Sequence, residues 1–67
     1  MQVIEVRRAA EDDTSLITKN GKVLKFENDI EAREFAVNNI EGSMRYSFII
    51  QWEIISEEKA KSLGHKI

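Results

Sequence analysis

The fold is decided by one stretch of the chain, FENDIEAREFAVNNIEG, which spans residues 26–42. Asn28 is a residue type that caps helix N-termini, and Glu31 follows three residues later, where a capping box places an acid. Gly42 stands where a helix commonly stops. The apolar residues between these ends are Ile30, Ala32, Ala36, Val37 and Ile40, with Phe35 at the margin. Their helical spacing predicts one long amphipathic helix.

The opposite side of this expected helix is acidic. Glu31, Glu34 and Glu41 fall together there, and we expect them to face solvent. Such a surface can attract a basic partner or mimic the charge of a nucleic acid. The alternative is that these charges only keep the surface solvated.

Before the helix, Asn20-Gly21 separates two alternating runs, residues 15–19 and 22–27. This pair tolerates the positive φ angles of a type I′ turn, so a tight hairpin is predicted. Its register pairs Lys19 with Lys22, Ile17 with Leu24, and Ser15 with Phe26.

Two further strands are expected, residues 3–8 and 44–55. In the first, Ile4 and Val6 share one face, and Val3, Glu5 and Arg7 share the other. In the second, alternation places Ile49 and Ile55 on the back and the following residues on the helix side: Tyr46, Phe48, Ile50, Trp52 and Ile54. A right-handed crossover would set this last strand parallel to the first.

A short helix closes the chain. Ser56 caps residues 57–63, Gly64 ends them, and Ala60, Leu63 and Ile67 are the side chains available for docking. The element order β-β-β-α-β-α predicts one α+β domain over residues 1–67. We expect an antiparallel β-meander with the main helix packed on one face.

That arrangement leaves an apolar set on the back of the sheet. Its members are Val3, Leu16, Val23, Ile49 and Ile55. Either the terminal helix or another molecule must cover them, since small monomers seldom expose such a patch. Val23, Ile49 and Ile55 are therefore candidate partner-binding residues.

Composition argues against catalysis. The 67 residues carry a net charge of −2, no cysteine and one histidine, His65, which we expect to be a solvated tail residue. The acids at 11–13 lack the spacing of a calcium loop, and no phosphate-binding glycine loop is present. We expect no enzyme, no metal and no cofactor. With no membrane-spanning run or secretory signal visible, a cytoplasmic location is the default.

Lysines concentrate at the hairpin. Lys19, Lys22 and Lys25 would meet nucleic-acid phosphates if that were the partner. The alternative is an ordinary charged hairpin tip, since three lysines are few for a nucleic-acid module.

One resemblance follows from these residues. Residues 25–36 join a strand to a capped helix through Glu31-Ala32 and Phe35-Ala36, and a long strand follows. This architecture, over residues 15–55, resembles the small strand-strand-helix-strand proteins with which phages inhibit host RNA polymerase or CRISPR nucleases. The resemblance implies an accessory protein that acts by occupying a surface.

The leading hypothesis is accordingly a non-catalytic protein-binding module. It would be encoded by a phage or mobile element and would inhibit a host nucleic-acid-processing complex by steric or electrostatic blockade. Direct nucleic-acid binding by the hairpin is one alternative. A self-associating structural protein is another, because a strand as long as residues 44–55 can pair with a second copy of itself.

Overall fold

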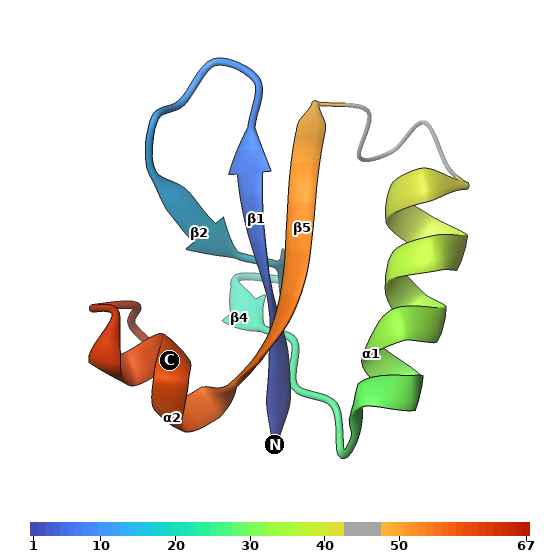
Figure 1. The fold of residues 1–67 in the computed structure, drawn as a ribbon, viewed down its shortest axis with the longest axis vertical. Helices are drawn as coiled ribbons and strands as arrows, with labels where there is room; N and C mark the ends of the chain where they lie inside the picture. Colours follow the sequence, from blue (N-terminus) through green and yellow to red (C-terminus); the bar gives the residue numbers. More distant parts are fainter. Residues whose placement is uncertain (43–47) are drawn as a thin grey trace.

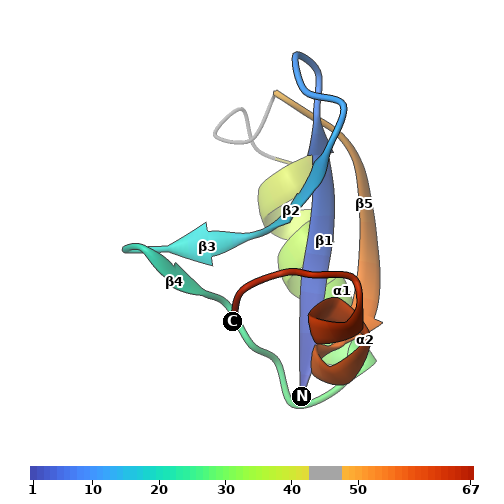
Figure 2. The same ribbon diagram turned by 90° about the vertical axis from the view of Figure 1, so that its left-hand side faces the viewer.

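The computed structural model describes residues 1–42 and 48–67 of the chain. Its centre is an antiparallel sheet in the order β2-β1-β5, made of Thr14–Leu16 (β2), Gln2–Arg8 (β1) and Ile49–Ser56 (β5). A helix packs on each face of this sheet (Figures 1 and 2). One face carries α1 (Asp29–Phe35), which continues as the π-helix η1 (Ala36–Glu41), and the other carries α2 (Glu57–Ser62). The predicted α+β class, with the main helix on one face, is confirmed.

The main helix begins and ends where the sequence predicts. Asn28 Oδ1 accepts a hydrogen bond from the Glu31 backbone N–H at 2.9 Å. At the other end the helix widens, and the Gly42 N–H donates to the carbonyl of Val37, five residues earlier, at 3.0 Å. Gly42 has φ −96°, which any residue adopts, so its glycine is not needed for a left-handed turn. Space is the constraint there, because a Cβ on Gly42 would lie 3.0 Å from the Val37 oxygen.

The predicted hairpin is also confirmed, as β3 (Thr18–Lys19) and β4 (Lys22–Val23). Lys19 lies opposite Lys22, and the Leu24 N–H donates to Ile17 at 3.1 Å. Asn20 and Gly21 have φ of 55° and 79°, the two positive values that a type I′ turn requires. The hairpin projects away from the three-stranded sheet (Figure 2).

The pairing of Ser15 with Phe26 is wrong. Ser15 lies opposite Val6, whereas Phe26 forms an antiparallel bridge with Gln2. The chain leaves the sheet after Ile17 and returns to the same edge of β1 only at Gln2. The main helix therefore starts beside the N-terminal end of β1.

This return path reverses the direction of the last strand. The helix runs from the Gln2 end of β1 toward the Arg8 end, so β5 must run back, antiparallel to β1 (Figure 1). The predicted parallel arrangement is wrong for that reason. The predicted first part of the strand, including Met44 and Tyr46, lies outside the described residues.

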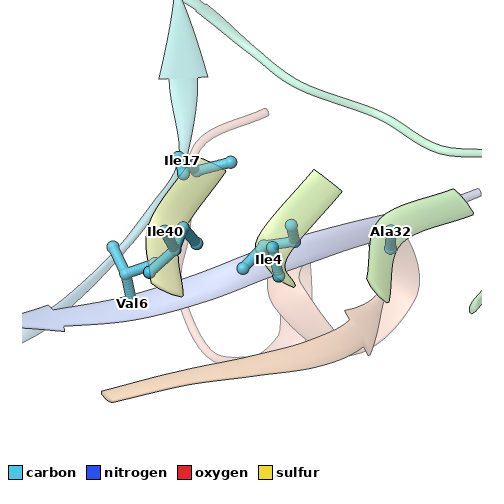
Figure 3. Packing of buried hydrophobic residues seen from close by; sticks show 6 residues of the cluster. Ile4, Val6, Ile17, Ala32 and Ile40 are labelled. Atoms are coloured by element: carbon cyan, nitrogen blue, oxygen red, sulfur yellow. The ribbon is translucent and has the colours of Figure 1, made fainter. Parts of the chain in front are cut away.

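The main core lies between α1 and the sheet. Its buried members are Ile4, Val6, Ile17, Ala32, Ala36 and Ile40 (Figure 3). Two of the three helix residues in this set are alanines, whose small side chains let the helix approach the sheet closely. Phe35 packs at the margin of the core, with its ring centroid 5.4 Å from that of Phe26. Figure 3 shows Ile40 over Val6 and Ala32 at the other end of the layer.

A second, smaller core lies under α2. Val3, Leu16, Ile55 and Ala60 are buried there, and Val23 packs at their edge. Ser56 Oγ caps α2 by accepting from the Lys59 N–H at 3.0 Å, as predicted. Only Ala60 of the three expected docking residues is fully buried. The other two, Leu63 and Ile67, are 55% and 39% exposed, so the prediction that they dock is wrong.

Candidate functional surfaces

The solvent side of the main helix carries apolar side chains that the sequence pattern assigned to the core. Ile30 is 71% exposed and Val37 is 46% exposed. Glu34 lies between them in sequence, four residues after Ile30 and three before Val37, so the three share one stripe of the helix. We call Ile30, Glu34 and Val37 the outer α1 face.

Helix geometry explains this correction. The residues that pack inward are Ala32, Phe35, Ala36 and Ile40. These positions recur every three or four residues and define one side of the helix. Ile30 is two residues from Ala32, about 200° around the axis, which is nearly the opposite side. The predicted stripe was therefore too wide, and its two outlying members face solvent.

The three predicted acidic residues are all exposed, but two of them already have structural contacts. A carboxylate oxygen of Glu31 reaches back to the Glu27 N–H at 3.4 Å and so supports the helix start. Glu41 Oε2 accepts a hydrogen bond from Trp52 Nε1 at 3.0 Å, which ties the end of η1 to β5. Glu34 pairs with no cation among the described residues. Of the three, Glu34 is the one left to meet a partner.

The predicted open surface of Val23, Ile49 and Ile55 does not form. Ile55 is 4% exposed because α2 covers it, and Val23 packs at the edge of the same cluster. Ile49 lies on the other face, against the main core.

A bulge in β5 moves Ile49 to that face. The register shifts where Arg7 faces Gln51 but Arg8 faces Ile49, so Ile50 is an extra residue. One inserted residue inverts the alternation of the residues before it. Ile50 itself is 56% exposed, so the prediction that it lies on the helix side is wrong.

The hairpin lysines form a second charged surface, and the structure adds a member to it. Lys22, Lys25 and Lys66 line a hollow of about 400 Å³ whose apolar part comes from Val23 and Ile67. Lys19 and Lys22 stand directly opposite each other across the hairpin, where like charges repel. Lys66 could not be foreseen, because its position depends on how the chain after α2 folds back.

Lys25 is already paired. Its Nζ lies 3.1 Å from Glu57 Oε2, and the N-terminal ammonium approaches the same carboxylate at 3.9 Å. The hydrogen bond from Lys25, more than any other contact, lowers the pKa of Glu57 below its ordinary value of 4.5. Lys19 and Lys22 are therefore the hairpin cations with more freedom to meet a ligand.

His65 is not the solvated tail residue that the sequence predicts. Its side chain is 13% exposed, and Nε2 lies 2.7 Å from Oε2 of Glu5 on β1. The same carboxylate oxygen accepts from Thr14 Oγ1 at 3.1 Å. This group fixes the chain after α2 against the polar part of the sheet. No local sequence signal indicates the contact, since sixty positions separate the two residues.

In residues 1–42 and 48–67, no three histidine, cysteine, aspartate or glutamate side chains are placed to hold a metal ion. Every helix in these ranges is too short or too polar to cross a lipid bilayer. Comparison of the chain with protein families, with curated proteins and with solved structures finds no significant match.

Proposed function

We propose that this protein is a non-catalytic, cytoplasmic protein-binding module that docks a partner on the outer α1 face. The observation that carries the proposal is the exposure of Ile30 and Val37 on a helix that buries alanines on its other side. Apolar side chains seven residues apart are the anchors that a helix offers to a groove. Their exposure costs solvation free energy that a partner would recover.

Charge defines the partner. Asp29, Glu31 and Glu34 are exposed around Ile30, and α1 has Arg33 as its one basic residue. The fitting partner surface is an apolar groove bordered by lysine or arginine. Proteins that process nucleic acids present such basic surfaces. Blockade of a complex of this kind, in the manner of the phage inhibitors that residues 25–36 resemble, is the role we propose.

Site-directed photo-crosslinking tests this proposal. A benzophenone amino acid replaces Ile30 in one variant and Leu63, the residue that follows α2, in the matched control, since both residues are more than half exposed. Each variant is mixed with an extract of the source cells and irradiated. We expect one partner to crosslink to position 30 and not to position 63. The crosslinked peptide of that partner should be rich in lysine or arginine.

Two further variants complete the test. Glu34→Lys should reduce the yield at position 30, whereas Glu58→Lys, the same charge change on α2, should not. Equal crosslinking from positions 30 and 63, or a partner peptide without basic residues, would contradict the proposal.

Nucleic-acid binding is the second candidate, and the lysine-lined hollow favours it. The opposed Lys19 and Lys22 and the neighbouring Lys66 form a basic group at one end of the molecule. Anisotropy titration of labelled single strands and duplexes would show affinity falling steeply with salt. At a fixed salt concentration, the double variant Lys22→Ala with Lys66→Ala should bind nucleic acid more weakly than the unmodified chain. The control double variant, Lys59→Ala with Lys61→Ala, should bind as the unmodified chain does. Binding that ignores salt would exclude this candidate.

A further inference from the structure

The outer edge of β5 is the longest unpaired strand edge among the described residues. β5 is the last strand in the order β2-β1-β5, and no other strand in residues 1–42 and 48–67 lies beside its far side. Figure 2 shows α1 behind β1 and α2 near the end of β5, so neither helix lies along most of this edge. An open edge is a template for another strand.

The hydrogen bonds of β1 show which backbone groups of β5 point outward. Gln2 exchanges hydrogen bonds with Phe26, at 2.7 and 2.8 Å, and the Ile4 carbonyl accepts from Ile17 at 2.9 Å. Even-numbered residues of β1 therefore bond toward β2, and odd-numbered residues bond toward β5. The odd-numbered residues Val3, Glu5 and Arg7 lie opposite Ile55, Glu53 and Gln51.

It follows that Gln51, Glu53 and Ile55 use their backbone groups inside the sheet. Trp52 and Ile54, between them, direct N–H and C=O to the free edge. The usual protections of an edge are sparse here, because β5 contains neither proline nor lysine. Its one charged residue is Glu53.

We propose that this edge pairs with β5 of a second copy of the chain, antiparallel and with Trp52 on the two-fold axis. In this register the two Trp52 residues exchange backbone hydrogen bonds. Gln51 faces Glu53 of the second copy, where an amide can donate to a carboxylate, and Ile50 faces Ile54. Each side chain therefore meets a compatible neighbour.

Two nearby registers are less favourable. A two-fold axis at Glu53 sets two carboxylates directly opposite each other, which is destabilising. An axis at Ile54 brings Trp52 against Ser56, where β5 already turns into α2. Charge and strand length thus favour the register centred on Trp52 over these two. This pairing is independent of the outer α1 face and leaves the function proposed for it unchanged.

Substitutions at Gln51 give the pairing a signed test. Gln51 is exposed and lies opposite Arg7 within one chain, so the glutamate of Gln51→Glu faces a cation in the monomer. In the dimer the same glutamate faces Glu53 of the second copy, which creates two like-charge pairs. We expect its dimer dissociation constant to rise roughly 3- to 30-fold. Gln51→Lys places opposite charges there and should lower the constant. Asn38→Glu, which adds the same charge as Gln51→Glu on α1, should leave it unchanged.

Sedimentation from micromolar to millimolar concentration measures the constants, and amide exchange locates the contact. The N–H groups of Trp52 and Ile54 should exchange more slowly as concentration rises, while that of Glu53, already bonded to β1, should not change. A strict monomer across this range would overturn the proposal. So would two Gln51 variants that shift dissociation in the same direction, or exchange at Trp52 that is independent of concentration.

Discussion

Ile30 and Ile40 lie on one continuous helix, and replacing each in turn by alanine tests how that helix is oriented. Ile40 is 7% exposed and packs against Val6 and Ile17, whereas Ile30 is 71% exposed. Removing a buried isoleucine side chain to alanine costs about 2–5 kcal/mol of unfolding free energy. For 67 residues the whole stability is only roughly 3–10 kcal/mol. Ile40→Ala should therefore remove a large part of it.

Ile30→Ala should behave differently. About three tenths of the residue is shielded from water, and full burial of an isoleucine contributes about 1.5–3 kcal/mol, so the loss of apolar burial is at most about 0.9 kcal/mol. Alanine is the better helix former by about 0.4 kcal/mol, which offsets half of this loss. The net change should stay within about 0.5 kcal/mol.

Thermal and urea unfolding followed by circular dichroism, with the fluorescence of Trp52 as a second probe, measures both variants. At about 4–8 °C per kcal/mol, Ile40→Ala should lower Tm by roughly 8–40 °C and Ile30→Ala by less than about 4 °C. Equal losses from the two substitutions would refute the orientation of the helix. The outer α1 face would then be part of the core.

Three further outcomes are expected. Asn28→Ala should lower the unfolding free energy by about 1 kcal/mol in urea titrations, because it removes the cap on Glu31 N–H, whereas Asn38→Ala should have little effect. Glu41→Gln should weaken the hydrogen bond from Trp52 and shift its emission, and an unchanged spectrum would argue against that contact. Lys25→Met should raise the pKa of Glu57 toward 4.5 in a carboxyl NMR titration. Since the folded pKa is the lowered one, the pair stabilises the fold above about pH 4.5 and is lost as acid protonates Glu57.

The local features of the fold could be predicted from sequence. The Asn20-Gly21 turn and the Asn28 and Ser56 caps depend on a few adjacent residues, and each stands in the structure where the sequence places it. The sequence allows either the terminal helix or another molecule to cover the back of the sheet. Ala60, buried against Val3, decides it.

The features that the sequence does not predict depend on contacts between distant parts of the chain or on an irregularity within a strand. A bulge at Ile50 inverts the face of Ile49, and nothing in an unbroken alternation announces an inserted residue. The hairpin turns out of the sheet after Ile17, which reverses the direction of β5. His65 meets Glu5 only because α2 returns the chain across the sheet.

The candidate surfaces were predicted in part for the same reason. The exposure of Glu34 follows from helical periodicity, and Lys19 opposite Lys22 follows from the turn. Apolar residue type alone assigns Ile30 and Val37 to the core, whereas their angle around the helix axis separates them from Ala32 and Ala36. Alanine at 32 and 36 was the available signal, since two small inward residues mark the side that approaches a sheet.

Solvent access to the methyl groups tests the central claim, that helices seal both faces of the sheet and leave the outside of α1 open. A soluble paramagnetic agent broadens methyl NMR signals according to their exposure. The methyls of Ile30 and Val37 should broaden strongly, while those of Ile4, Ile40 and Ile55 should persist. Strong broadening of Ile55, or protection of Ile30 in the isolated chain, would contradict the account.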